Sequence, residues 1–264
     1  MTAEQSRMLR LLCVFKEICE THRLRYYLAG GTLLGAVRHQ GFIPWDDDID
    51  VSMPLNDFQK FQELCAALPE RVEIQSEEND PRYPFVFCKL CDTTYPFHTG
   101  YPNEPKGVYI DIFPLLPSRR LNGETKFRFE VISVINYLLQ VKLDWTGFIP
   151  YKLPWARFGY WLLSHFSVEQ LRSIRRKQIS RLYRADGEEA LCSPGGVYQA
   201  DKEFFPTEWY RDVVQLIFEG ESFCAPVGFR EYLSRNYGDY MELPVPEERR
   251  TRHRKKPEQR GEGE

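Results

Sequence analysis

Helical and strand patterns alternate over the first 67 residues, and this alternation limits the fold more than any other feature of the sequence. Apolar residues recur at helical spacing in three segments, and β-rich runs with Gly or Pro at their ends separate them. The expected helices cover residues 4–21, 32–39 and 56–67, and the expected strands cover residues 24–29 and 47–53. Helices that alternate with strands in this way indicate an α/β fold.

The pattern changes after residue 67. Further β-rich runs lie at residues 72–75, 85–91 and 108–113, and longer helical patterns lie at residues 124–143 and 155–184. We therefore expect an α/β core over residues 1–117 and a helical region over residues 118–246 that completes the fold. Residues 247–264 carry seven Arg or Lys and almost no apolar side chains, which predicts a basic, flexible tail.

Charge balance and hydropathy exclude several classes of protein. The 35 Lys and Arg against 38 Asp and Glu give a net charge of -3, which excludes the strongly basic surface of a general nucleic-acid binder. No apolar run approaches the ~20 residues that span a bilayer, so we expect no transmembrane segment. Seven scattered cysteines indicate a reducing compartment, and we expect a cytoplasmic protein. The basic pattern at 172–184 is compatible with a solvated helix face or with peripheral contact at the inner face of a membrane.

A dense acidic run stands directly before an apolar strand. Its carboxylates belong to Asp46, Asp47, Asp48 and Asp50. If the run enters the strand, Asp46, Asp48 and Asp50 share one face, with successive side chains ~7 Å apart. Like charges this close raise each other's pKa unless a cation lies between them, and Mg²⁺ prefers carboxylate and phosphate oxygens. The run therefore predicts a metal site, with an exposed acidic turn or a structural Ca²⁺ loop as the alternatives.

Two further features match such a site. Asp111 lies within the apolar run at 109–113, where a buried carboxylate needs a cation, a metal or a hydrogen-bond donor; a salt bridge is the alternative. Upstream, Gly30, Gly31 and Thr32 begin a helical pattern, and the N–H groups and hydroxyl of such a start can bind phosphate. The two glycines do not have the spacing of a dinucleotide-binding fingerprint.

The order of these parts matches the pattern of the nucleotidyltransferase fold: Gly-Gly, then Asp48-Ile49-Asp50-Val51, then Ile110-Asp111-Ile112. Residues 27–54 resemble the signature block of the LicD family of phosphocholine transferases, a group that includes the fukutin-related phospho-alditol transferases. The resemblance continues at residues 107–115 and 237–250. It implies a nucleotidyltransferase-like α/β core with a mixed β-sheet, completed by a helical C-terminal region that contains the acceptor site.

The resemblance also implies an activity, that of a LicD-like phosphotransferase for substituted phosphate groups. A phospho-alcohol, with phosphocholine favoured, would pass from a CDP-alcohol such as CDP-choline to a sugar hydroxyl of a cell-surface glycan precursor or lipid-linked glycan, and CMP would leave. Mg²⁺ or Mn²⁺ would assist, with Asp48, Asp50 and Asp111 as metal ligands. Asp111 or Asp46 would accept the hydroxyl proton.

Four more side chains are candidates for binding the donor. Arg38, His39 and Lys89 can neutralise its phosphates, and surface roles are the alternative for each. Trp45 can stack on cytosine or on a quaternary ammonium, and a core position is the alternative. A nucleotidyltransferase that transfers NMP and releases pyrophosphate, or a non-catalytic module that binds a glycan or metal, is the alternative function.

Overall fold

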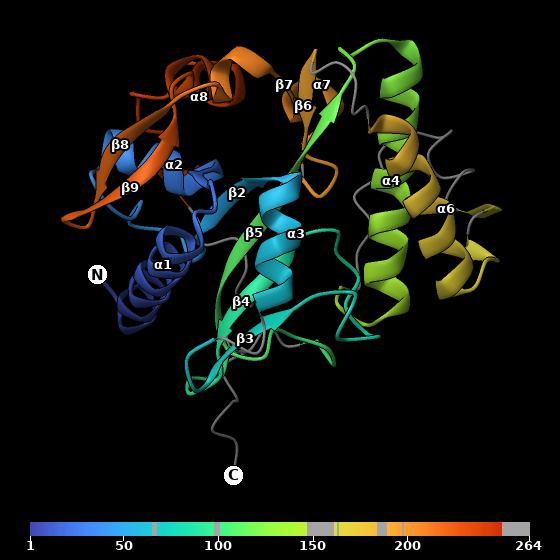
Figure 1. Ribbon diagram of the computed structural model, residues 1–264, viewed down its shortest axis with the longest axis horizontal. Coiled ribbons are helices and arrows are strands. Elements are labelled where there is room, and N and C mark those ends of the chain that lie inside the picture. The colour runs from blue at the N-terminus through green and yellow to red at the C-terminus, as the bar shows by residue number, and fades with distance from the viewer. Residues whose placement is uncertain are drawn as a thin grey trace.

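The structure is a computed structural model, and it describes residues 1–64, 68–97, 101–146, 161–162, 164–183, 189–196 and 198–249. The predicted α/β class is confirmed: helices surround a curved, mixed β-sheet (Figure 1). Most of the predicted basic tail, residues 250–264, lies outside the described residues, as do residues 147–160.

The N-terminal elements follow the predicted order. They are α1 (Ala3–His22), β1 (Tyr27–Leu28), α2 (Gly30–Arg38), β2 (Asp50–Pro54) and α3 (Leu55–Glu63). Thr2 and Gln5 form a capping box that satisfies orphan N–H groups at the start of α1. The apolar face of α1 is buried through Met8, Leu12 and Phe15. β2 begins three residues later than the predicted strand, so Asp47 and Asp48 lie in the loop before it.

The main sheet is mixed, as predicted. Its other N-terminal strands are β3 (Val72–Gln75), β4 (Cys88–Asp92) and β5 (Val108–Ser118), and the strand order is β1-β2-β5-β4-β3. β2 and β5 are parallel, whereas β1 pairs with β2, and β4 with both β3 and β5, in antiparallel orientation. β5 is thus a central strand with neighbours on both sides, which buries its apolar residues.

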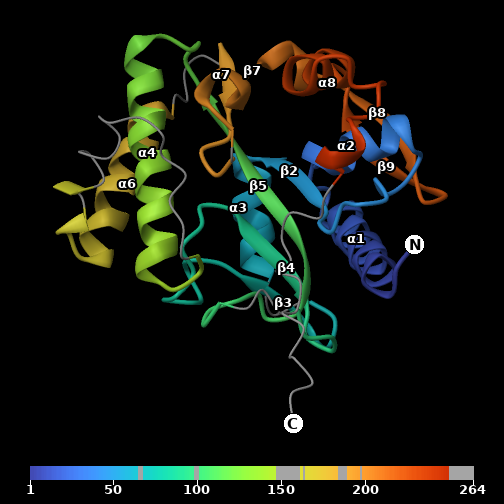
Figure 2. The ribbon, with the colours of Figure 1, turned by 180° about the vertical axis from the view of Figure 1, so that it is seen from behind.

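Two long helices form a layer beside the sheet. α4 (Gly123–Lys142) and α6 (Val168–Leu182) lie side by side in both views (Figures 1 and 2). Ile135, Leu138 and Leu171 are buried between them. Arg172 and Arg175, from the basic run, are also buried: Arg172 donates hydrogen bonds to the carbonyls of residues 81 and 83, and Arg175 pairs with Glu77. Part of that run therefore stabilises the fold.

The region after residue 182 is not only helical, which corrects the sequence analysis. It contains the short strands β6 (Ala190–Cys192) and β7 (Phe204–Pro206), the strands β8 (Val213–Phe218) and β9 (Glu221–Pro226), and the helices α7 (Ala200–Glu203), η2 (Thr207–Tyr210), α8 (Phe229–Tyr237) and η3 (Pro246–Glu248). β6 pairs with β5 and extends the main sheet, whereas β8 and β9 form a hairpin. The hairpin turn has positive φ at Glu219 and Gly220, the conformation of a type I′ turn.

One hydrophobic cluster contains residues from both halves of the chain. Phe15 and Val51 belong to the same cluster of buried residues as Phe205, Phe223 and Leu233. The division of the chain at residue 117 stays a prediction. In the described ranges, no helix has both the length and the apolar character that crossing a membrane requires.

Candidate active site

Three neighbouring strands place charged side chains in one row across the sheet. Asp50 of β2 lies opposite Asp111 of β5, and Lys89 of β4 lies opposite Asp111 on the other side. Adjacent strands are about 4.8 Å apart, so residues in register on three strands are close neighbours. The row joins the acidic run to the isolated aspartate, although some sixty residues of sequence separate them.

Lys89 and Asp111 form a buried ion pair. The Lys89 Nζ lies 2.6 Å from Asp111 Oδ1, and the two side chains are only 5% and 12% exposed. The ammonium group also lies 3.6 Å from the centre of the Tyr109 ring and 5.2 Å from that of Phe87. These contacts show that Lys89 neutralises a carboxylate of the site itself. The salt bridge left open for Asp111 is present, and its role as a metal ligand stays a prediction.

Asp50 is held at the start of β2 by the helix before it. Its backbone N–H donates to Thr32 Oγ1 at 2.8 Å, so the Thr32 hydroxyl joins α2 to the acidic strand. Burial raises the pKa of Asp50 well above its usual value, and the negative charges of Asp48, Asp111 and Asp46 raise it further. The acidic residues therefore repel one another at this point, and a bound cation would relieve that repulsion.

The two glycines allow the first turn of α2 to approach these carboxylates. Gly30 has a positive φ of 51°, and a Cβ there would overlap the Asp50 carboxylate. A Cβ at Gly31 would overlap the carboxylate of Asp46 in the same way. The Gly30 N–H donates to the Tyr232 hydroxyl at 3.2 Å. The structure thus brings Gly30, Gly31 and Thr32 to the acidic site, and their binding of phosphate stays a prediction.

The remaining predicted residues gather at the C-terminal end of α2. Arg38 donates hydrogen bonds to the carbonyls of Tyr240 and Glu242, which attaches the C-terminal segment to the helix. His39 packs edge-on against Trp45, and burial followed by the charge of Arg38 lowers the pKa of His39. The Trp45 ring also faces the guanidinium of Arg249, 5.5 Å from its centre. Trp45 therefore already contacts a cation of its own chain.

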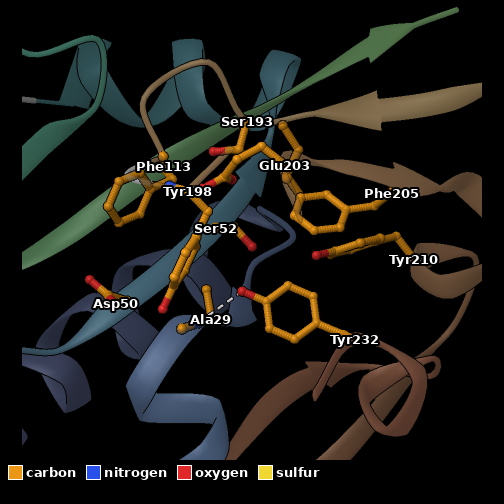
Figure 3. A pocket seen from close by; sticks show the side chains of 13 residues that line it. Ala29, Asp50, Ser52, Phe113, Ser193, Tyr198, Glu203, Phe205, Tyr210 and Tyr232 are labelled. Carbon is orange, nitrogen blue, oxygen red and sulfur yellow. Dashed lines mark hydrogen bonds between the residues drawn. The ribbon is translucent and has the colours of Figure 1, made fainter. Parts of the chain in front are cut away.

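A small pocket that begins at Asp50 contains residues that were not predicted from the sequence. Its volume is about 60 Å³, and Phe113, Tyr198, Phe205, Tyr210, Tyr232 and Glu203 contribute to its walls (Figure 3). Burial raises the pKa of the Glu203 carboxyl to about 8. Most of these residues lie on separate short elements after residue 190, so no local pattern marked them; the one local signal was Glu203 directly before the apolar pair Phe204 and Phe205.

The acidic residues offer the oxygen ligands that a hard divalent cation prefers, but the described residues do not form a complete set of ligands. Within the described ranges, no three His, Cys, Asp or Glu side chains form a ready-made group of metal ligands. The donors at the site are carboxylate oxygens, which Mg²⁺ and Mn²⁺ accept, and the repulsion at Asp50 favours a cation. The donor set therefore fits such an ion in its chemistry.

Together, a mixed sheet, two aspartates in register on adjacent parallel strands and a Gly-Gly helix start define a protein of the nucleotidyltransferase fold class. The family described as "LicD/FKTN/FKRP, nucleotidyltransferase domain" matches residues 23–131, which include the whole charged row. The chain is also 30% identical over 270 residues to the lipopolysaccharide cholinephosphotransferase LicD of Haemophilus influenzae, across 95% of this chain and 94% of that protein.

Two further proteins match shorter parts of the chain. An uncharacterized protein of Rickettsia typhi is 46% identical over 130 residues, which cover 46% of this chain and 41% of that protein. The human ribitol 5-phosphate transferase FKRP is 33% identical over 100 residues, which cover 38% of this chain and 18% of that protein. The chain belongs to the LicD family, and it is an enzyme of the phosphotransferase class.

Proposed function

We propose that the enzyme transfers a phospho-alcohol, with phosphocholine favoured, from a CDP-alcohol donor to a sugar hydroxyl of a cell-surface glycan precursor. The observation that carries this proposal is the similarity to a lipopolysaccharide cholinephosphotransferase over nearly the full length of both proteins. The CDP-linked donor is what the resemblance to the LicD family implies. A cytoplasmic location and peripheral contact with a membrane stay predictions.

In the proposed reaction, the acceptor oxygen attacks the phosphorus atom that bears the alcohol. A new P–O bond forms to the sugar, the bond from that phosphorus to the bridging oxygen breaks, and CMP leaves with the bridging oxygen. The hydroxyl proton passes to Asp46 or Asp111. Asp46 lies at the helix start beside Gly31, and Asp111 already receives a hydrogen bond from Lys89. Gly30, Gly31, Thr32, Arg38 and His39 would orient the donor phosphates.

We further propose that Asp48, Asp50 and Asp111 hold Mg²⁺ or Mn²⁺. Such an ion supplies positive charge to the phosphate oxygens as the hydroxyl attacks. Chelation with EDTA is expected to abolish turnover and to leave the fold unchanged, because the core clusters do not depend on the acidic residues. Activity assays beside circular dichroism measure both effects, and added Mg²⁺ should restore turnover. Full activity in exhaustively chelated buffer would contradict the metal proposal.

The nucleotide product tests the proposed function. We expect acceptor-dependent CMP from at least one donor among CDP-choline, CDP-ribitol and CDP-glycerol, with a crude glycan as acceptor, because attack on the outer phosphorus makes CMP the leaving group. Chromatography of the nucleotides measures it, and CTP serves as the matched control donor. Pyrophosphate from CTP, with no CMP from any CDP-alcohol, would instead identify a nucleotidyltransferase that transfers NMP.

A further inference from the structure

The pocket beside Asp50 is lined by aromatic rings on several sides. Phe205 of β7 packs against Tyr210 of η2 and Tyr232 of α8, with ring centres 5.7 and 5.4 Å apart. Tyr198 also lines the pocket, and in the view of Figure 3 its ring appears between Asp50 and the other rings. Aromatic faces carry partial negative charge and attract cations, quaternary ammonium groups in particular.

A buried acid completes the pocket wall. Glu203 is only 5% exposed, and its Oε1 accepts a hydrogen bond from the Tyr198 backbone N–H at 3.0 Å. A side chain at Gly196 would overlap the Glu203 carboxyl, so the glycine provides the room for it. The neighbouring Lys202 donates instead to the carbonyl of Asn236 at 2.7 Å. Over the part of the chain that the structure describes, Glu203 forms no ion pair, and a buried carboxylate without one is costly.

We propose that this pocket binds the trimethylammonium group of a choline-bearing donor, with Phe205, Tyr210 and Tyr232 around its methyl groups and Glu203 as its counter-charge. The inference rests on the proposed function, because the donor's phosphate would then lie toward Asp50. The pocket volume of about 60 Å³ exceeds the ~15 Å³ that one water needs, so there is room for a small head group.

If Glu203 is the counter-charge of the bound cation, choline affinity should depend on pH. Because burial raises its pKa to about 8, the carboxyl is mostly neutral at pH 7, and a bound cation would favour the ionised form. Choline binding should therefore release a proton, and affinity should rise with pH up to about 8. The titratable or charged groups facing Glu203 from the surrounding elements are Cys192, Tyr198, Lys202, Tyr210 and Tyr232, with Asp50 at the far end of the pocket. Burial raises the pKa of Cys192, Tyr210 and Tyr232, which keeps them neutral over this range.

Binding of choline and of its neutral isostere, 3,3-dimethylbutan-1-ol, to the full-length protein tests the proposal without any turnover. NMR titrations at pH 6.5 and pH 8 should show that choline binds at least about tenfold more tightly than the isostere, and more tightly at the higher pH. Glu203→Gln should remove most of this preference and the pH dependence. Glu208→Gln, which removes an exposed carboxylate on the same segment, is the matched control and should change neither. Equal affinities for choline and the isostere in the wild-type protein would overturn the proposal.

If Glu203→Gln does not fold, a pair of variants at Tyr210 tests the choline pocket instead. Tyr210→Phe keeps the aromatic face and should keep choline affinity within about twofold, whereas Tyr210→Leu should lower it about tenfold. Equal effects of the two changes would overturn the proposal.

The experiments distinguish failure of the choline pocket from failure of the proposed function. Release of CMP from CDP-ribitol, with no preference for choline over its isostere in the wild-type protein, would overturn only the choline pocket. Selective, Glu203-dependent choline binding without CMP from any donor would support the pocket and contradict the proposed reaction.

Discussion

Replacement of Asp50 by Asn is expected to lower turnover at least about 10³-fold, with the fold intact. An ion held at the acidic site would contribute several kilocalories per mole to the transition state, and each 1.36 kcal/mol is about tenfold in rate. Asn keeps the shape of the side chain and its backbone bond to Thr32, but it loses the charged oxygen that would bind the ion. The same loss is expected for Asp48→Asn.

Although Asp50→Asn should lose turnover, its thermal stability should equal or exceed that of the wild type. The pKa of Asp50 is raised in the folded protein, so the folded form holds its proton more tightly than the unfolded chain. Stability is therefore lost as the pH rises above the unfolded value, about 4, toward the raised pKa. Because Asn carries no charge, Asp50→Asn should melt at the same or a higher temperature at pH 7.

Turnover of the CDP-alcohol and thermal melts by circular dichroism measure the two effects of Asp50→Asn. Asp212→Asn is the control, because Asp212 is an exposed aspartate whose side chain pairs with the equally exposed Arg211. It should leave both rate and melting temperature near those of the wild type. Near wild-type turnover in Asp50→Asn or Asp48→Asn would show that these carboxylates do not hold the metal.

Replacement of Lys89 by Met is expected to lower the free energy of unfolding by about 3–5 kcal/mol. The change keeps much of the apolar stem but leaves Asp111 buried without its cation, and loss of one partner of a buried ion pair has effects of this size. The double variant Lys89→Met with Asp111→Asn should recover most of that loss, since no buried charge remains. Denaturant titrations of the two single variants and the double variant measure the coupling.

The matched control for this pair lies at the surface. Lys106 and Glu73 form an ion pair of nearly the same length, 2.8 Å, but their side chains are 38% and 51% exposed. Lys106→Met should therefore change stability by less than about 1 kcal/mol. If Lys89→Met were as stable as the wild type but bound the donor poorly, Lys89 would act as a phosphate ligand and not as the partner of Asp111.

Much of the acidic site could be predicted from the sequence because its signals are local. Four aspartates beside an apolar strand and Asp111 within an apolar run are costly placements without a cation, whatever the fold. The glycine pair before a helical pattern indicates a close approach of backbone, and the structure shows Asp46 and Asp50 against those glycines. The order of the three features matched the pattern of the nucleotidyltransferase fold, and the resemblance of residues 27–54 indicated the LicD family.

Other parts of the fold have weak local signals. β6 and β7 are three residues long, and the β8–β9 turn uses Glu219 and Gly220 in place of the usual Asn-Gly pair. β6 forms because β5 continues beyond the predicted strand and offers its edge to it, which is a long-range pairing, and β7 then pairs with β6. The longer helical patterns around these strands therefore led to the prediction of a helical region over residues 118–246.

Spacing and composition along the chain were enough to predict the α/β class and the acidic residues, and the resemblance of residues 27–54 indicated the family. Only the tertiary structure decided that Lys89 pairs with Asp111, because strand register joins residues with no sequence relationship. It also decided that Glu203 lies among Phe205, Tyr210 and Tyr232 in a pocket next to Asp50. Burial and charge at that pocket arise from elements that meet only when the chain is folded, since each is too short to specify its neighbours alone.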